Sequence, residues 1–324
     1  MTCVIGIDIA KNTFDIAKPL ANGKYRTKAK LPNTPDGFKQ FDQWLDKHAE
    51  PGCWVLMEAT GVYHEALATH LYQHGYQVSV INPARITKYA ESELKRVKTD
   101  KTDAKLIAIY ADRHQDVLRP WEPEPEQVKQ LKGLVRRLDD LKELIQMERN
   151  RLDVAPMAAQ ASIHTLIEHL EGQMALIRQA IDDHIDSDPD LRSKKDLMAS
   201  IDGVSDNTAA LLLAELGGDP LRFGSAKSLV AFFGLNPRLQ DSGNQKGRAM
   251  ISRTGSSRLR SGLYMPAVVA MTYNPAIKAL KARLNERGKV GRLVVCAAMR
   301  KLLHIIYGVL KSGQPFDPQK ALAR

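Results

Sequence analysis

The sequence has few cysteines, and their spacing excludes two common ways of stabilising a small domain. Only Cys3, Cys53 and Cys296 occur, far apart and without paired ligand spacing. We therefore expect neither a cysteine zinc site nor a disulfide framework. The sequence also lacks a basic leader with a cleavage site, and no apolar run approaches the roughly 20 residues that a membrane span needs. These absences favour a cytoplasmic protein without a membrane partner.

Acidic residues are outnumbered by basic ones. The 324 residues include 47 lysines and arginines against 37 acids, which gives a formal net charge of +10. Such a balance favours polyanionic partners, with nucleic acid first among them. The 44% hydrophobic content is ordinary for a globular protein with a proper core. The length predicts about two or three domains.

The first 122 residues have the pattern of an α/β sheet. Asn22-Gly23 predicts a hairpin turn, and strands then alternate with helices along the chain. Strands are expected over residues 3–9, 12–18, 24–31, 53–57 and 77–81. Helices are expected over residues 37–47, 63–75 and 103–112.

Prolines at 120, 123 and 125 mark a boundary, and the pattern beyond them is helical. The pattern over residues 123–190 predicts an antiparallel helical hairpin or coiled-coil arm that is divided near Pro156. The alternative is an ordinary pair of amphipathic helices in the core. Residues 191–324 predict a mainly α domain. Its segment 197–217, around Gly203-Val204, resembles a helix-hairpin-helix, whose turn can hold a backbone phosphate. Further helices are expected over residues 225–233, 259–271, 276–285 and 293–310.

Four acids have spacings typical of a metal-dependent nuclease centre. Asp8 lies in one apolar strand and Glu58 ends another, so neighbouring strands can bring them together. Asp100 and Asp103 are three residues apart, so both point from one side of a helix start. Clustered carboxylates repel one another unless a cation compensates, and oxygen ligands suit Mg²⁺ or Mn²⁺. The alternative for Asp100 and Asp103 is a solvated, salt-bridged helix start. The alternative for Glu58 is an acid that stabilises the start of the helix that follows it.

The order of several motifs resembles a known family. GIDIAK, MEATG, VINPAR and KTDKTDA resemble the RuvC-like half of the DEDD transposases of the insertion-sequence family IS110, which includes Piv-type DNA invertases. IDGVSDNTAALLLAELG, FFGLNPRLQDSG and GSSRLRSGLYMPA resemble its C-terminal transposase domain. The resemblance covers nearly the whole chain outside the helical arm. It implies an RNase H-like (RuvC-like) domain over residues 1–122 that binds Mg²⁺ (or Mn²⁺) through Asp8, Glu58, Asp100 and Asp103, and a transposase domain over residues 191–324.

The resemblance also implies a serine nucleophile at Ser242, in LQDSGNQKG. Its hydroxyl stands beside Gly243 in a loop and can be exposed. Cations that could hold a scissile phosphate follow in the sequence: Lys246, Arg248, Arg253, Arg258 and Arg260. A plain turn fits the same residues equally well, so three alternatives stay open as the nucleophile: Ser252, Ser256 and Ser257.

The function implied by the resemblance is strand exchange on DNA by an insertion-sequence recombinase, through a covalent phosphoserine intermediate. The family implies guidance by a structured bridge RNA that pairs with target and donor DNA, and assembly as a homodimer or homotetramer in the bacterial nucleoid. The alternatives are a junction resolvase that uses metal and water, an actin-like ATPase and a non-catalytic DNA-binding protein. The ATPase would need a second glycine-rich phosphate hairpin and an adenosine motif, and neither is found.

Two other groups of residues favour a structural interpretation. The tyrosines lack the His and Arg constellation of tyrosine recombinases: Tyr63, Tyr110 and Tyr264. The histidines of one expected helix have no cysteine or acid partners in sequence, which indicates surface or packing residues: His64, His70 and His74.

Overall fold

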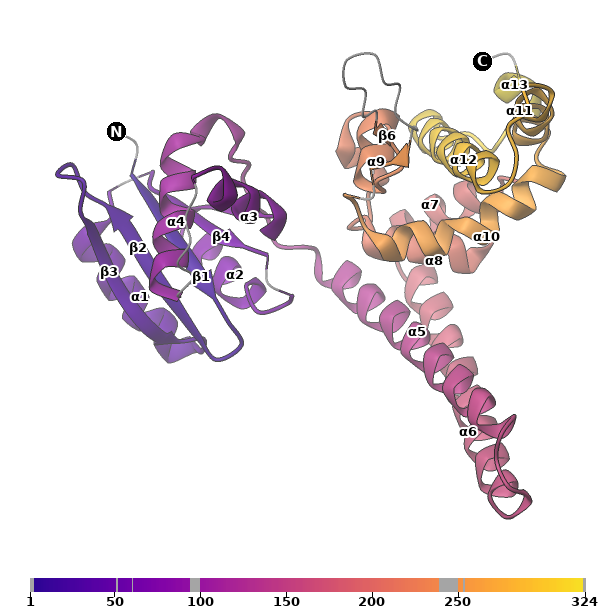
Figure 1. The fold of residues 1–324 in the computed structure, drawn as a ribbon, viewed down its shortest axis with the longest axis horizontal. Helices are drawn as coiled ribbons and strands as arrows, with labels where there is room; N and C mark the ends of the chain where they lie inside the picture. Colours follow the sequence, from indigo (N-terminus) through magenta and orange to yellow (C-terminus); the bar gives the residue numbers. More distant parts are fainter. Residues whose placement is uncertain are drawn as a thin grey trace. The chain divides into compact units, whose positions relative to one another are not determined.

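The computed structural model divides the chain into two compact units, Met1–Pro123 and Glu124–Arg324 (Figure 1). It describes residues 3–50, 52–59, 61–93, 100–238, 250–252 and 254–322. The first unit ends among the prolines that the sequence places between the sheet and the long helices.

Unit 1 is a mixed α/β sheet with helices on both faces. The strand order is β3-β2-β1-β4-β5, in which β2 is antiparallel to both of its neighbours and β1, β4 and β5 run parallel. The strands are β1 (Val4–Ile9), β2 (Thr13–Pro19), β3 (Tyr25–Pro32), β4 (Trp54–Glu58) and β5 (Gln77–Ile81). The helices are α1 (Pro35–His48), α2 (Glu65–Gln73), α3 (Pro83–Ser92) and α4 (Asp100–Arg113). All five strands lie within one residue of the expected bounds, which confirms the sequence prediction of a sheet.

Unit 2 is mainly helical. Its two long helices, α5 (Glu126–Leu152) and α6 (Met157–Asp186), form an antiparallel hairpin, in which Arg149 pairs with Glu171 at 2.7 Å. At the other end of the hairpin the His184 ring donates to the carbonyl of Gln127 at 2.7 Å. The remaining elements are α7 (Pro189–Ala199), α8 (Asp206–Glu215), α9 (Ala226–Phe232), β6 (Pro237–Arg238), β7 (Met250–Ile251), α10 (Ser257–Tyr273), α11 (Pro275–Glu286), α12 (Arg292–Ser312) and α13 (Pro318–Leu322).

Helix α12 is the central core helix of unit 2. Among the described residues, it is the one helix whose length and composition would allow it to cross a membrane. However, most of the apolar stretch of this helix is buried inside the protein. Leu302, Leu303 and Ile306 are fully buried among the other helices of the unit. The apolar character of α12 therefore serves the core.

Cys3 and Cys53 form a disulfide, contrary to the expectation from their spacing. Each cysteine directly precedes a strand, and those strands, β1 and β4, are parallel neighbours. Val4 and Trp54, the next residues, are register partners in the sheet. Residues that are 50 positions apart in sequence are therefore adjacent in space, which the sequence spacing alone does not reveal.

The two faces of the sheet carry different side chains. Alternate residues of β1 pack under α1 and α2 in one core cluster: Ile5, Ile7 and Ile9. Val4 packs instead with residues of α4. Because successive side chains of a strand point to opposite faces, Gly6 and Asp8 lie on the α4 side. Figure 1 shows α4 crossing this face of the sheet.

Gly6 allows α4 to approach the sheet closely. A Cβ on this residue would lie 2.8 Å from the Cα of Ala108 and closer still to other backbone atoms of α4. Real Cβ atoms do not come this near to backbone, and backbone cannot rotate away as a side chain can. Ala17 and Ala104 complete a small-residue cluster with Ala108 at this contact. The position of α4, and of the acids on it, therefore depends on small residues on both surfaces.

Gly6→Ala is expected to destabilise unit 1 by at least about 3 kcal/mol, since overpacking costs about 1–3 kcal/mol even where side chains can adjust. Urea unfolding followed by circular dichroism measures this change. The matched control is Gly172→Ala in α6, where an added Cβ meets open space. There the same change is expected to stabilise the helix by up to about 1 kcal/mol. Equal stability of the Gly6→Ala and wild-type proteins would contradict the close approach of α4.

Candidate active site

Asp8 and Glu58 lie beside each other on neighbouring parallel strands. Ile7 of β1 is the register partner of Met57 of β4, so Asp8 and Glu58 occupy the next position on their strands. Both side chains are half-buried, and Glu58 is the last residue of its strand. The carboxyl ends of parallel strands meet at one edge of a sheet, so the structure brings these two acids together.

Helix α4, which packs on the same face of the sheet, carries a third acid near its beginning. The beginning of β1, at Val4, packs against the second half of α4, whereas Gly6 lies against its middle. The strand and the helix therefore run in opposite directions, so Asp8, further along β1, lies towards the first turn of α4. Asp103 in that turn is half-buried. Asp100 is the first residue of α4, and its side chain lies outside the described part of the chain. The positive end of the helix dipole favours carboxylates in this turn.

A fifth acid, Asp15, faces the same side of the sheet and was missed in the sequence analysis. It is the register partner of Asp8 across β1 and β2, and it is only 7% exposed. Its carboxylate accepts a hydrogen bond from the backbone N–H of Lys30 at 3.3 Å. Lys30 has a φ of 56°, and the pairing of β2 with β3 shifts register beside Asp15. Asp15 therefore supports this irregularity and places a further carboxyl group next to Asp8.

The predicted nucleophile, Ser242, lies outside the described residues, as do Lys246, Arg248 and Arg253. Two of the alternative serines have local hydrogen bonds. Ser256 caps α10 by accepting from the N–H of Leu259 at 3.3 Å, and Ser252 accepts from the Thr254 hydroxyl at 3.2 Å. Ser257 is the first residue of α10. The hydroxyl of Ser256 thus already has a structural role.

Arg258 and Arg260, predicted to bind phosphate, both contact protein groups. Arg258 lies 2.8 Å from a carboxylate oxygen of Asp139 on α5 and 3.5 Å from one of Glu215 on α8. Arg260 donates to two backbone carbonyls, at 2.9 and 2.7 Å. These contacts hold α10 against its neighbours. A nucleic-acid role for either arginine stays a prediction, in which phosphate would compete with these partners.

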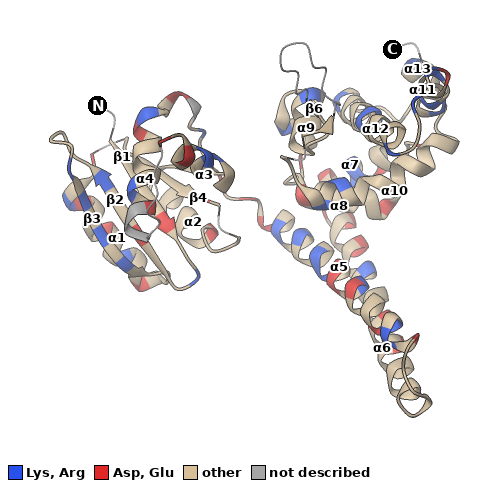
Figure 2. Cartoon of the chain, viewed as in Figure 1, with Lys and Arg blue, Asp and Glu red and all other residues tan. Residues whose placement is uncertain are grey.

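Other cations of unit 2 gather on α9 and α12. The pKa of His304 on α12 is lowered, first by burial and then by the charges of Arg300, Lys301 and Lys227. His304 is therefore neutral at pH 7, and the positive charge of this surface comes from the lysines and the arginine. Figure 2 shows basic residues on α9, β6 and α12. These elements provide a cationic surface among the described residues.

The glycine turn that resembles a helix-hairpin-helix lies between α7 and α8. Gly203 has a φ of 100°, a conformation that favours glycine, and a Cβ there would lie within 2.7 Å of the Ala270 side chain on α10. Ser205 begins α8 by accepting from the N–H of Thr208 at 3.4 Å. The glycine is therefore needed for the packing of this turn against α10, whatever the turn binds.

The acids on the α4 side of the sheet in unit 1, together with the helical unit 2, agree with one class of protein. The family model of IS110-type DEDD proteins, described as "Transposase", matches residues 5–155. A second, described as "Transposase IS116/IS110/IS902 family", matches residues 195–282. The chain therefore belongs to the IS110 family of DEDD transposases, which confirms the family indicated by the order of the motifs.

Relatives within this family match over nearly the full chain. The pilin gene-inverting proteins of Moraxella bovis and Moraxella lacunata are each 34% identical over 317 residues, which is 97% of this chain and 97% of either relative. A mini-circle putative transposase for IS117 from Streptomyces coelicolor is 22% identical and covers 100% of this chain and 97% of its own length. Similarity therefore extends through both units.

Proposed function

We propose that this protein is a DNA recombinase that cuts and rejoins strands in transposition or inversion. The observation that carries the proposal is the placement of Asp8 and Glu58 at neighbouring positions of β1 and β4, with Asp103 in the first turn of the helix that packs on the same face of the sheet. Relatives named as transposases and as gene-inverting proteins support the same reaction class. We infer that the sheet of unit 1 is RNase H-like (RuvC-like), and that the hairpin of α5 and α6 acts as a coiled-coil arm.

The acids offer a donor set that fits Mg²⁺ or Mn²⁺. Carboxylate oxygens are the ligands these hard cations prefer, and the residues that would hold them are Asp8, Glu58, Asp100 and Asp103. When bound, such ions stabilise negative charge on the phosphate and on the entering and leaving oxygens. The chain itself supplies the rest: the strand register fixes two of the acids, and the packing of α4 against Gly6 fixes the helix that carries the others.

The nucleophile of the proposed reaction is Ser242. Its hydroxyl loses a proton, and its Oγ forms a bond to phosphorus while the bond from phosphorus to a deoxyribose oxygen breaks. The DNA leaves with a free hydroxyl, and the protein carries the other end as a phosphoserine ester. Attack by a hydroxyl of a second strand rejoins the DNA and releases the serine. Neighbouring cations, Lys246 and Arg248 among them, would stabilise the charge that develops on the phosphate.

The proposed partners are target DNA, donor DNA and a structured bridge RNA. In this scheme base pairing with the RNA selects the sequence, and the protein recognises backbone and shape. A net charge of +10 suits contact with several phosphates at once. We propose that the protein acts as a homodimer or homotetramer, so that acids and serines of different copies can act on the same junction.

Strand exchange by the purified protein is expected to require RNA transcribed from the non-coding DNA beside its gene. With that RNA, we expect at least about 100-fold more joined product than with an RNA whose loops are scrambled, because mispaired guides abort recognition. Quantitative amplification across the new junction measures the product. Equal product with both RNAs would contradict guidance by RNA, and cutting without joining would favour a metal-dependent junction resolvase that uses water.

A further inference from the structure

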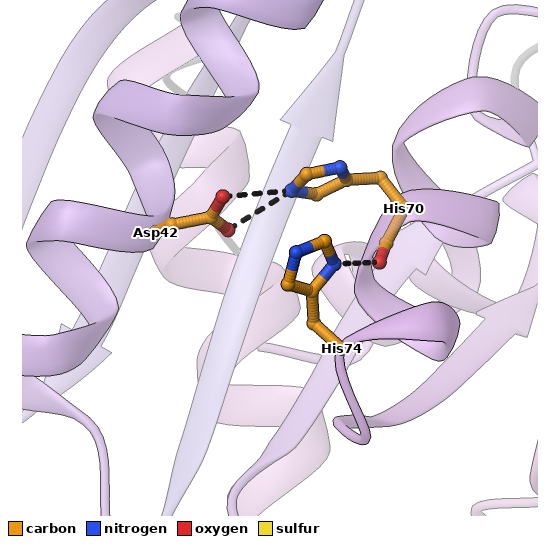
Figure 3. Close-up of side chains that lie close together, drawn as sticks. All are labelled: Asp42, His70 and His74. Atoms are coloured by element: carbon orange, nitrogen blue, oxygen red, sulfur yellow. Dashed lines mark hydrogen bonds and ion pairs between the residues drawn. The ribbon is translucent and has the colours of Figure 1, made fainter.

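Three side chains of types that can hold a metal ion lie close together on the other face of the sheet, away from Asp8 and Glu58. Asp42 of α1 and His70 and His74 of α2 place their ligand atoms within 4.8 Å of one another. Figure 3 shows both imidazole rings turned towards the space beside the carboxylate. We propose that these three residues bind a transition-metal dication of the zinc type. The proposal is independent of the recombinase reaction and of its acidic site.

The contact between His70 and Asp42 has nearly the spacing of two ligands of one ion. The Nε2 atom of His70 lies 3.0 and 2.9 Å from the two carboxylate oxygens. Ligand atoms on a tetrahedral zinc ion with bonds of about 2.0–2.1 Å are separated by roughly 3.3 Å. A shift of a few tenths of an ångström would therefore let the ion replace the proton on Nε2, which leaves to solvent.

The hydrogen bond made by His74 leaves its other ring nitrogen able to bind a metal ion. Its Nδ1 lies 2.7 Å from the backbone carbonyl of His70, and because a carbonyl only accepts, Nδ1 must carry the hydrogen. The Nε2 atom of the neutral ring then presents a lone pair. Metal-ligating histidines usually have this arrangement, in which a hydrogen bond at one nitrogen fixes the tautomer at the other. The two rings are 4.2 Å apart between centroids.

The helices that carry these ligands are anchored in the core. The ring of Phe38 on α1 lies tilted against the ring of His70, with 5.3 Å between their centroids, and this contact joins the two helices beside the site. Phe41 and Leu71, next to the ligands in sequence, are fully buried in the cluster under α1 and α2. Asp42 and His70 keep side-chain exposures of 25% and 20%, so an ion from solvent can reach them. The ligands are therefore accessible but fixed.

The composition of the cluster selects a class of metal. Two imidazole nitrogens and one carboxylate suit Zn²⁺, Co²⁺ or Ni²⁺, whereas Mg²⁺ prefers oxygen ligands only. A further carboxylate lies on the same helix as Asp42, at Asp46. Asp46 stands one turn beyond Asp42 on α1 and so adds to the attraction for a cation. A bound ion would join α1 to α2, with water completing its coordination.

The test is Co²⁺ titration of the full-length, chelator-treated protein in millimolar Mg²⁺, which occupies carboxylate sites. We expect one equivalent of Co²⁺ to bind with the visible absorption of mixed nitrogen and oxygen ligands. His74→Gln, at an exposed position, and His70→Gln should each weaken binding by about 100-fold or more. The matched control is His169→Gln on the exposed surface of α6, which should bind as the wild type does.

Three results would overturn the proposal. One is Co²⁺ affinity in His74→Gln and His70→Gln equal to that of the wild type. Another is the absence of any Co²⁺ equivalent in the wild-type protein once Mg²⁺ is present. The third is loss of the Co²⁺ signal in Asp8→Asn but not in the histidine variants, which would assign the ion to the acid face. Circular dichroism of each variant verifies that the protein is folded.

Discussion

Asp8→Asn is expected to reduce DNA strand cleavage by at least about 10³-fold. Divalent cations contribute several kcal/mol of transition-state stabilisation, and each 1.36 kcal/mol changes a rate tenfold. Asparagine has nearly the same size as aspartate, so β1 should keep its pairing with β2 and β4. DNA affinity, measured by fluorescence anisotropy, should stay within about twofold because phosphate contacts dominate it. Cleavage of a labelled duplex in Mg²⁺, with the bridge RNA present, gives the rate.

The matched control for this prediction is Asp36→Asn on α1. Asp36 is 87% exposed and contacts only Lys39 at 3.5 Å among the described residues, so the same chemical change there should leave cleavage unaltered. Glu58→Gln should behave as Asp8→Asn does, since the two carboxylates are neighbours in the sheet. Full activity of Asp8→Asn and Glu58→Gln in Mg²⁺ would remove this edge of the sheet from the reaction.

The strands and their faces follow from the sequence because period-two alternation is a local property. Ile5, Ile7 and Ile9 predict one buried face of β1, and Asp8 must then point to the other. Phe14 and Ile16 give the same information for Asp15, which was available in the pattern but not used. The register that places Asp15 opposite Asp8 was not available, since it depends on the hairpin and on the irregularity at Lys30.

Contacts between distant elements could not be predicted from spacing. His70 was interpreted as lacking an acid partner because none lies near it in α2, yet Asp42 stands 28 residues earlier on α1. The pairing of Arg258 with Asp139 spans more than a hundred residues, so a local concentration of positive charge gave no sign of it. In both cases the packing of helices, which no local pattern encodes, decides which charges meet.

Ser242→Ala is expected to abolish the covalent protein–DNA adduct and to lower recombination by at least about 10³-fold, as loss of a catalytic serine does in other enzymes. Alanine lacks the oxygen that forms the bond to phosphorus, and the acids alone can only activate water, which leaves no protein–DNA bond. RNA and DNA binding should be unchanged. Trapping the wild-type reaction and digesting the protein should give a DNA-linked peptide that contains Ser242.

The neighbouring serines provide the control for this result. Ser256→Ala removes a helix cap, so it should lower the stability of unit 2 by about 1 kcal/mol while the adduct still forms. A DNA-linked peptide containing Ser252 or Ser257 would assign the nucleophile to that residue and keep the mechanism. Efficient recombination by Ser242→Ala, with no adduct on any serine, would instead require water as the nucleophile. The four acids predicted to bind metal would then catalyse the reaction without a protein nucleophile.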